Sequence, residues 1–387
     1  MDHSLFQRRA IFEPEHEDFR ASVRAFLAKE AVPRREEWDA AGMPSRDFWR
    51  AAAGNGFVGY EAPEEYGGLG LRDFRFNAIV NEECCYAGVL NDSFTLQNDV
   101  LLPYLIELTT EEQRDRWLRR FTAGDLIVSI GMTEPGGGSD VRALATRARE
   151  DGDGWIVNGS KTFITSGIDA DLVVTAVRTG TDARGRAEIT LLGIEDGMEG
   201  FERGRKLDKV GRHGIDTAEL FFNDVHVPRE NLIGEVGQGF RYLTANLARE
   251  RLGVAVIAIA AAEYALAITL EYVKDRTAFG TPIGSFQVNR HALARLRTEL
   301  ASARRYTDAC IVMENAGTLS ASEAAGLKAY TTELQWEVTD RCLQLHGGYG
   351  YMEEYDIARE WRNARVQRIY GGTTEIMWEI VGREMGL

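Results

Sequence analysis

Two short segments contain residue types that could hold a flat heterocyclic cofactor. MTEPGGGSD (132–140) reads as a strand end followed by a glycine-rich loop, which exposes backbone N–H groups and the hydroxyls of Thr133 and Ser139. One strand later, NGSKTFITSG (158–167) alternates Phe163 and Thr165 on one strand face. An electron-rich ring system needs an aromatic or apolar floor and hydrogen-bond donors around its rim, and this pair of segments offers both. Taken singly, each segment is more typical of an ordinary hairpin.

Other cofactor motifs are incomplete in this sequence. GEVGQG (234–239) has the wrong glycine spacing for a dinucleotide fold and follows no βαβ pattern. In GWIVNGSKT (154–162) a serine separates the glycine from Lys161, so we interpret the segment as a β-turn between strands rather than a phosphate loop. EPEHED (13–18) has metal-ligand residue types, but an acidic first helical turn explains it better. We expect no metal.

The hydrophobic pattern divides the chain into three parts that must position these segments. Apolar residues recur at helical spacing from 15 to 121, and Gly124 closes this region. Short β-rich runs from 125 to 234 predict an antiparallel sandwich or barrel. Beyond Gly239 long helical patterns return, and 240–276 is apolar around most of its circumference, as in a buried helix. We expect an α+β multidomain protein with an N-terminal α-helical domain (1–124), a middle β domain (125–236) and a C-terminal helix-bundle domain (237–387).

Composition narrows the class of partner. The 387-residue chain is 44% hydrophobic and carries a formal net charge of -15, which disfavours nucleic acid as a partner. Its four cysteines are too few for a disulfide framework and fit a reducing compartment. The first residues resemble neither a secretory signal nor a transit peptide, and the most apolar run, 254–262, is too short to span a membrane. We expect a soluble protein of a bacterial cytoplasm.

Seven motifs in a fixed order extend from about Phe12 to the C-terminus. They are PEEYGGLG, MTEPGGGSD, NGSKTFITSG, KLDKVGRHGIDTAELFFNDVHVPRENLIGEVGQGF, DRTAFGTPIGSFQ, CLQLHGGYGYMEEY and IYGGTTEI. Together they resemble the acyl-CoA dehydrogenase family, and the closing motifs look closest to its long-chain branch. The resemblance implies the same three domains, with the C-terminal domain a four-helix bundle. It also implies that FAD lies between the β domain and the bundle, and that a neighbouring subunit completes its site.

The resemblance implies roles for individual residues. The positions that match flavin contacts on the β domain are Met132, Thr133, Gly138, Ser139, Phe163 and Thr165. The positions that match the partner subunit's contacts along FAD are Arg276, Phe279, Gln344, Gly347, Gly348, Thr373 and Glu375. Phe163 stands where the family usually has Trp, so it keeps a π-face but lacks the indole N–H. Such an interlocked site implies a homo-oligomer, usually a tetramer in this family.

The implied reaction forms an α,β double bond in a fatty-acyl thioester. A base removes the α-proton, the β-hydrogen leaves as hydride to the flavin, and the carbonyl oxygen must receive hydrogen bonds as negative charge develops. A carboxylate buried beside an apolar chain suits the base, because burial raises its pKa.

Many family members carry this base as glutamate in the motif I-Y-E-G-T, where this chain has Gly371. The isovaleryl-type and long-chain-type enzymes instead place it on the long helix before an arginine, and here Glu250 precedes Arg251. We therefore expect Glu250 to be the base, rather than a surface charge paired with Arg249. Gly371 leaves room for this carboxylate, and its backbone N–H can serve the thioester oxygen.

The expected substrate is a fatty-acyl-CoA. By their motifs, Ser139 and Gly372 lie near the substrate, and Arg251 orders the adjacent segments. The region 86–98 is a candidate lining of the acyl pocket. A carrier-protein thioester remains open as the substrate, and an acyl-CoA oxidase, a flavin monooxygenase or a non-catalytic binding protein of the same fold remain alternatives. A dehydrogenase also needs an electron acceptor, by resemblance an electron-transferring flavoprotein.

Overall fold

The computed structural model describes residues 9–89, 92–140 and 143–387. Its N-terminal part is helical, and two π-helical segments, Thr95–Leu101 and Arg114–Leu118, connect shorter helices. The helices are α1 (Pro14–Glu30), α2 (Arg35–Ala41), α3 (Arg46–Gly54), α4 (Phe74–Ala87), α5 (Leu102–Glu107), α6 (Glu111–Gln113) and α7 (Arg119–Thr122).

The acidic segment 13–18 forms the N-terminal cap and first turn of α1. Ligand-type atoms of Glu13, Glu15 and His16 lie within 4.8 Å of one another. His16 is buried, its Nδ1 accepts the backbone N–H of Glu13 (3.2 Å), and its Nε2 lies 3.3 Å from an oxygen of Asp73. Because both ring nitrogens have partners within the protein, the cluster is explained as a capped helix start with acidic residues in its first turn.

The middle part is an eight-stranded sheet with the order β6-β7-β3-β2-β4-β5-β8 and β1 paired with β4. Its strands are β1 (Val128–Gly131), β2 (Arg147–Asp151), β3 (Gly154–Thr165), β4 (Leu172–Thr181), β5 (Ala187–Glu195), β6 (Phe201–Lys206), β7 (Thr217–Pro228) and β8 (Leu232–Ile233). Most pairs are antiparallel, as predicted. The exceptions are β1, which runs parallel to β4, and a single parallel pairing of β2 with β4. Alternation along one strand cannot reveal this partner choice.

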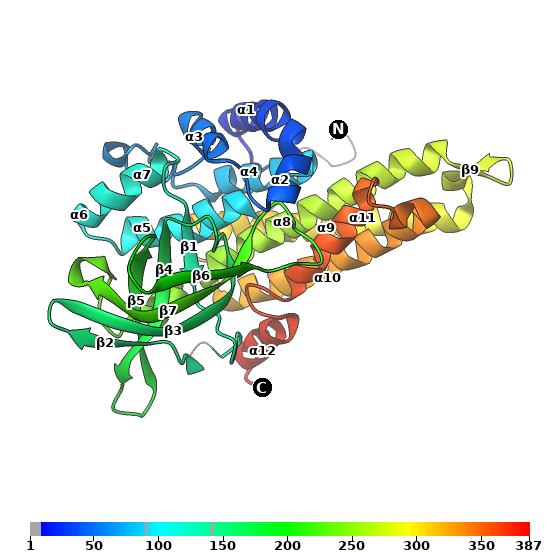
Figure 1. Ribbon diagram of the computed structural model, residues 1–387. Coiled ribbons are helices and arrows are strands. Elements are labelled where there is room, and N and C mark those ends of the chain that lie inside the picture. Colours follow the sequence, from blue (N-terminus) through cyan, green and yellow to red (C-terminus); the bar gives the residue numbers. More distant parts are fainter. Residues whose placement is uncertain (1–8, 90–91, 141–142) are drawn as a thin grey trace.

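The C-terminal part is helical and elongated (Figure 1). It contains α8 (Gly239–Asp275), α9 (Gln287–Asn315), α10 (Ala321–His346), α11 (Asp356–Arg365) and α12 (Thr374–Glu384), with a small hairpin of β9 (Thr277–Ala278) and β10 (Thr281–Pro282). The hairpin lies at the end of the bundle that points away from the sheet. By length and composition α8 could cross a membrane, but 94% of its most apolar window is buried inside the protein, which makes it a core helix.

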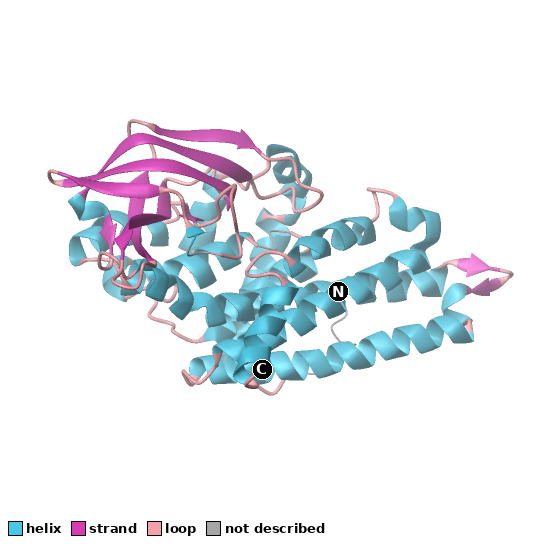
Figure 2. Ribbon diagram, turned by 90° about the horizontal axis from the view of Figure 1, so that it is seen from below, coloured by secondary structure: helices cyan, strands magenta, loops and turns pink. Residues whose placement is uncertain are grey.

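The sheet lies on one side of the helices, and long helices extend beyond it (Figure 2). One hydrophobic core joins Leu105 and Trp117 of the N-terminal part to Leu172 and Ile189 of the sheet. The approach is close, because a Cβ on Gly193 would lie 2.8 Å from the Trp117 ring. A second core joins α4 to α8. Consequently α8 is held on several sides, which fixes the side chains near its N-terminal half.

Candidate active site

Glu250 lies on α8 and is 9% exposed. Burial raises the pKa of its carboxyl to about 7, and the neighbouring Arg251 opposes this shift. Within the described part of the chain, Glu250 Oε1 has no hydrogen-bond partner. A buried carboxyl oxygen without a partner is costly, and groups of this kind gather at catalytic sites.

Arg249 does not pair with Glu250. Its guanidinium instead forms an ion pair with Glu61 and lies 3.7 Å from Glu314. The carboxylate of Glu61 also accepts a hydrogen bond from Asn77 (2.9 Å). The interpretation of Glu250 as a charge neutralised by Arg249 is therefore wrong, and its carboxyl is left free of this ion pair.

The loop that contains Gly371 lies against the same stretch of α8. A Cβ on Gly371 would stand 3.9 Å from Val254 Cγ2, and Val254 follows Glu250 by one helical turn. Gly371 has a φ of 64°, a left-handed conformation that favours glycine. The segments of Glu250 and Gly371 are about 120 residues apart in sequence, and both are predicted to act on the same thioester. In the fold they are neighbours.

Tyr370 fixes the loop on its other side. Its hydroxyl donates to Asp92 Oδ1 (3.1 Å), and the guanidinium of Arg212 lies 5.7 Å from its ring centroid. Arg212 and Asp92 form an ion pair with each other. These contacts tie the loop to the N-terminal helices and to the β domain together.

Two further side chains at this site were not predicted. Tyr104 is 2% exposed and its hydroxyl has no partner among the described residues; burial and then the charge of Glu250 raise its pKa. Lys328 on α10 is fully buried, and its Nζ donates to the carbonyl oxygen of Gly372 (2.7 Å). Neither residue belongs to a local motif, so only the tertiary structure could identify them.

The predicted flavin contacts of the β domain lie on two neighbouring segments. Met132 and Thr133 follow β1, and the backbone N–H of Thr162 in β3 donates to the Thr133 carbonyl (2.9 Å). The register of β3 shifts between Lys161 and Ile164, and within this bulge Phe163 has a φ of 58°. Phe163 is 67% exposed as a result. A strained bulge that turns an aromatic ring outward is typical of a binding surface.

An ion pair beneath these segments holds them together. Lys161 is fully buried, and its Nζ donates to Glu134 Oε1 (2.8 Å) and to the Met132 carbonyl (3.1 Å). The Glu134 carboxylate also accepts the backbone N–H groups of Ala145 (2.6 Å) and Thr146 (3.0 Å). Lys161 thus connects β3 to both ends of the glycine-rich loop. The local sequence around Lys161, an incomplete phosphate-loop motif, does not predict this role.

The glycine-rich loop itself is exposed. Gly138 and Ser139 lie in its outer part, and a Cβ on Gly136 or Gly137 would have no atom within 4 Å. Thr165 is half-buried at the end of β3, where its carbonyl accepts the Ser129 hydroxyl (2.6 Å). The structure thus brings the predicted β-domain residues together around an open surface.

A second group of predicted cofactor residues lies at the far end of the bundle (Figure 1). Arg276 and Phe279 flank or occupy the β9–β10 hairpin, and Phe279 is 97% exposed with a φ of 52°. The Arg276 guanidinium lies 5.6 Å from the ring centroid of Tyr349, which follows the end of α10. Gln344, Gly347 and Gly348, which are predicted for the same role, are exposed near the end of α10.

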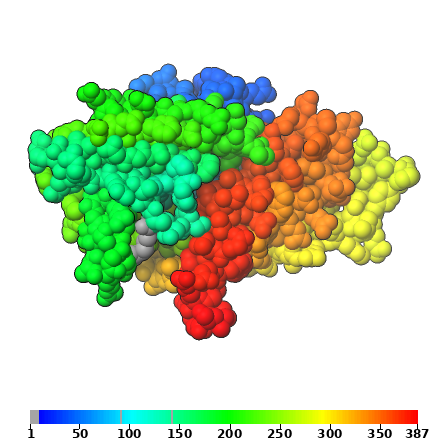
Figure 3. Space-filling model, turned by 60° about the horizontal axis from the view of Figure 1, so that its bottom comes forward, coloured from blue at the N-terminus to red at the C-terminus, as the bar shows by residue number. Residues whose placement is uncertain are grey.

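This second group cannot reach Glu250 within one chain. Arg276 follows Glu250 by about 26 residues of helix, or about 39 Å at 1.5 Å per residue. Thr373 and Glu375 begin α12, where the Thr373 hydroxyl accepts the Ile376 backbone N–H (3.4 Å). Figure 3 shows the C-terminal segment projecting from the body of the molecule. The predicted cofactor residues therefore fall into separate regions of the surface.

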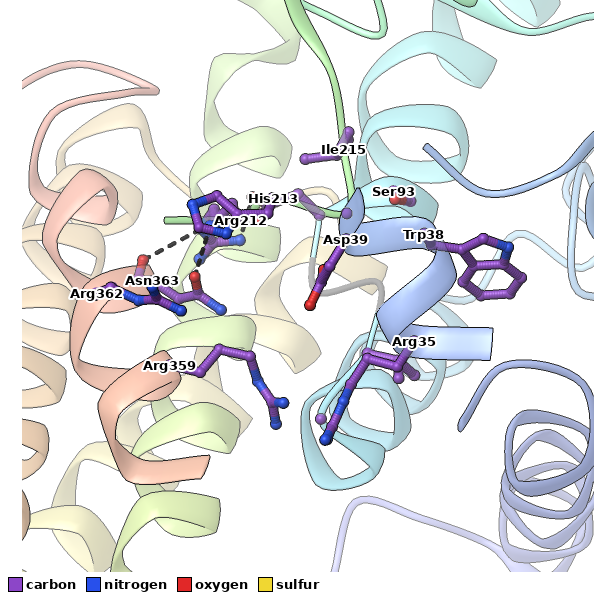
Figure 4. Close-up of a pocket in the computed structure, with 14 residues that line it drawn as sticks. Arg35, Trp38, Asp39, Ser93, Arg212, His213, Ile215, Arg359, Arg362 and Asn363 are labelled. Atoms are coloured by element: carbon purple, nitrogen blue, oxygen red, sulfur yellow. Dashed lines mark hydrogen bonds and ion pairs between the residues drawn. The ribbon is translucent and has the colours of Figure 1, made fainter. Parts of the chain in front are cut away.

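A pocket lies between α2, the end of α4, the loop before β7 and α11 (Figure 4). It includes Val89, Asp92 and Ser93 from the predicted acyl-lining region 86–98, whose residues 90 and 91 lie outside the described part. None of the predicted cofactor, substrate or catalytic residues lines it. It adjoins the site through Asp92, the partner of Tyr370.

Comparison with known proteins identifies the fold. Three family models match in order: Acyl-CoA dehydrogenase, N-terminal domain (residues 13–125), middle domain (129–225) and C-terminal domain (237–386). The chain is 44% identical to the mitochondrial long-chain specific acyl-CoA dehydrogenase of Sus scrofa, over 97% of this chain and 88% of the relative. It is 33% identical to the mitochondrial isovaleryl-CoA dehydrogenase of Solanum tuberosum, over 99% of this chain and 93% of the relative.

Solved structures agree with these relatives. The acyl-CoA dehydrogenase from Geobacillus kaustophilus superimposes with a TM-score of 0.94 at 46% identity, covering 97% of this chain and 99% of the other. These matches confirm the predicted fold, with its helical, β and helical parts, and the resemblance to the long-chain and isovaleryl branches. The chain belongs to the acyl-CoA dehydrogenase family of FAD-using enzymes.

Proposed function

We propose that the protein catalyses FAD-dependent α,β-dehydrogenation of a fatty-acyl-CoA thioester to the trans-2-enoyl-CoA, with Glu250 as the base. The observation that carries this proposal is the environment of Glu250. Its carboxyl is buried, keeps one oxygen without a protein partner among the described residues, and lies one helical turn from the contact with Gly371. A pKa of about 7 allows this group to accept a proton at neutral pH.

The residues around Glu250 suit the charge that develops in the substrate. Removal of the α-proton places negative charge on the thioester oxygen, which the backbone N–H of Gly371 is proposed to bind. Arg251 is 5% exposed and adds positive charge beside the base. Ser139 and Gly372 are proposed to line the path of the thioester and pantetheine. Because this chain has Gly371 where many family members have glutamate, there is space at this position for the carboxylate of Glu250 on α8.

The β-domain surface fits FAD. Phe163 presents an exposed ring, and the glycine loop after Thr133 leaves its backbone N–H groups open to a ligand. The residues proposed to hold FAD here are Met132, Thr133, Gly138, Ser139, Phe163 and Thr165. When bound, FAD supplies the acceptor for the hydride that leaves the β-carbon. A glutaryl-CoA dehydrogenase of this fold from Mycobacterium smegmatis, 24% identical, is solved in complex with FADH2.

The second group of residues supports a homo-oligomer, with a tetramer as the proposed form. Arg276 and Phe279 lie about 39 Å from Glu250 along α8 and are exposed, so we propose that they bind the FAD of a neighbouring subunit. Gln344, Gly347, Gly348, Thr373 and Glu375 are proposed to do the same.

The proposed electron acceptor is an electron-transferring flavoprotein. A solved chain of this fold, 34% identical with a TM-score of 0.86, is described as an electron transferring flavoprotein of Acidaminococcus fermentans. We further propose that the enzyme acts in fatty-acid β-oxidation in a bacterial cytoplasm.

An anaerobic titration of the yellow holoenzyme with acyl-CoA thioesters of increasing length tests the proposal. Loss of flavin absorbance with some thioesters is the expected result. An FAD-bound protein that no acyl-CoA reduces would contradict it. Rapid formation of hydrogen peroxide after the same reduction in air would instead assign the protein as an acyl-CoA oxidase.

A further inference from the structure

Lys328 is an unusual side chain for the interior of α10. It is fully buried, and within the described part of the chain no carboxylate lies within ion-pair distance of its Nζ. Its Nζ donates to the carbonyl oxygen of Gly372 (2.7 Å). A buried ammonium group without a counter-ion is costly, so its position next to this loop calls for a functional reason.

The loop that Lys328 contacts has little else to fix it at this point. Gly371 and Gly372 have φ values of 64° and 97°. Glycine can adopt many backbone conformations, so these two residues do not fix the loop by themselves. After them, the Thr373 hydroxyl caps α12, and before them Tyr370 is bonded to Asp92. Lys328 supplies the anchor between these two fixed ends.

The charge of Lys328 also belongs to the site. Burial, together with the positive charge of the nearby Arg251, lowers its pKa to about 8, so the two cations are close enough to interact. Glu375 acts in the opposite direction and Arg368 in the same one. Arg251 beside Glu250 and Lys328 beside Gly372 create a positive region where the reaction generates negative charge.

We propose that Lys328 is a positioning residue that holds the 371–372 backbone so that the Gly371 N–H can bind the thioester oxygen as its charge develops. This inference rests on the proposed function, because it assigns a role within the same reaction. Lys328 does not touch the substrate in this account. It acts through Gly372, and its charge adds to the stabilisation of the enolate.

The test separates α-proton removal from hydride transfer. In a 3-thia-acyl-CoA, sulfur replaces the β-methylene, so the α-proton can leave but no hydride can follow. The bound enolate gives a long-wavelength absorbance with the oxidised flavin, and its pH titration reports the apparent pKa of the α-proton. The variants are Lys328→Met, which keeps the length and loses the donor and charge, and Lys328→Arg, which keeps both. Thr331→Val is the control, because Thr331 is buried on the same helix and bonds only within it (Leu327 carbonyl, 2.8 Å, and Lys328 carbonyl, 3.3 Å).

For Lys328→Met we expect the limiting rate of flavin reduction to fall at least about tenfold and the apparent pKa of the bound α-proton to rise by about one unit, since one pKa unit is a factor of ten. The dissociation constant of the thioester should change less than about threefold, because ground-state binding is not the step affected. Lys328→Arg should recover a substantial part of the enolate signal, and Thr331→Val should match the wild type.

A wild-type rate and enolate titration in Lys328→Met would overturn the inference, and so would an effect confined to the dissociation constant. If Lys328→Met does not retain FAD, Lys328→Gln is measured by the same criteria. Failure of the proposed function is a different result, because then no thioester reduces the wild-type flavin.

Discussion

At the scale of single residues, the environment of Glu250 decides its chemistry. The same carboxyl on an exposed helix face would be ionised at neutral pH and solvated. Here burial raises its pKa to about 7, so that near neutrality it exists in both forms. That placement has a measurable cost to the folded protein.

The first prediction concerns this cost. The Glu250 carboxyl has a pKa of about 7 in the folded protein and an ordinary value of 4.5 in the unfolded chain. Between pH 4.5 and 7 the folded state therefore binds more protons than the unfolded state. Its stability therefore falls as pH rises through this interval, and above about 7 the loss is complete, at up to about 3 kcal/mol. Glu250→Gln should raise the apparent thermal midpoint at pH 8 and change it little at pH 4.5.

Paired thermal scans at the two pH values check this expectation. Glu354→Gln, at an exposed position, is the matched control and should not change the midpoint at either pH. Equal stabilisation of Glu250→Gln at both pH values would mean that ionisation is not the cause.

Sequence alone could identify Glu250 as a candidate but could not describe its environment. Position 371 lacks the usual glutamate, and Glu250 precedes Arg251 on the long helix. The ion pair of Arg249 with Glu61 and the hydrogen bond from Lys328 to Gly372 join segments that are distant in sequence. Such contacts carry no local pattern, and for this reason Lys161, Lys328 and Tyr104 were missed.

At the scale of elements, periodicity was a good guide. The long apolar helix and the β-rich runs occur where the sequence predicts them. The parallel pairing of β1 with β4 was not predicted, since strand alternation does not specify a partner. Nor were the π-helical segments at Thr95–Leu101 and Arg114–Leu118, which have no simple sequence signature.

A prediction at this scale concerns Lys161, which joins β3 to the glycine-rich loop. Lys161→Met removes two hydrogen bonds from a charged donor, each worth about 1.5–3 kcal/mol, so the loop should lose its fixed position. We expect the dissociation constant of FAD, measured by fluorescence titration of the apoprotein, to rise at least about tenfold.

Lys29→Met is the control for this experiment, because Lys29 is exposed on α1 far from the sheet in sequence. It should bind FAD as the wild type does. Unchanged FAD affinity in a folded Lys161→Met protein would show that the ion pair serves the sheet and not the cofactor.

At the scale of the whole molecule, the two groups of cofactor residues explain the elongated shape. One group surrounds Phe163 on the β domain, and the other surrounds Arg276 and Phe279 at the far end of the bundle. In the proposed assembly, the length of α8 carries Arg276 and Phe279 toward the neighbouring subunit. The assembly, on this account, is part of the active site.

Mixing two defective chains tests this shared site. The Glu250→Gln chain lacks the base but keeps Arg276, which is proposed to bind the neighbouring subunit's FAD. The Arg276→Ala chain keeps the base but lacks this FAD contact. Random association in a two-fold assembly would restore one complete site in each mixed pair, or about a quarter of all sites. Co-expression should therefore recover thioester-dependent flavin reduction to about this level, measured against each variant alone. Recovery no greater than the sum of the separate variants would contradict a site shared between subunits.

The central claim is that Glu250 removes the α-proton, and single-turnover flavin reduction of Glu250→Gln tests it most directly. Wild type and variant, both loaded with FAD, are mixed anaerobically with the thioester that reduces the wild type best. The account predicts unchanged FAD content and thioester binding, with a reduction rate at least about a hundredfold lower, as expected on loss of a general base. Flavin reduction at the wild-type rate would show that another group is the base.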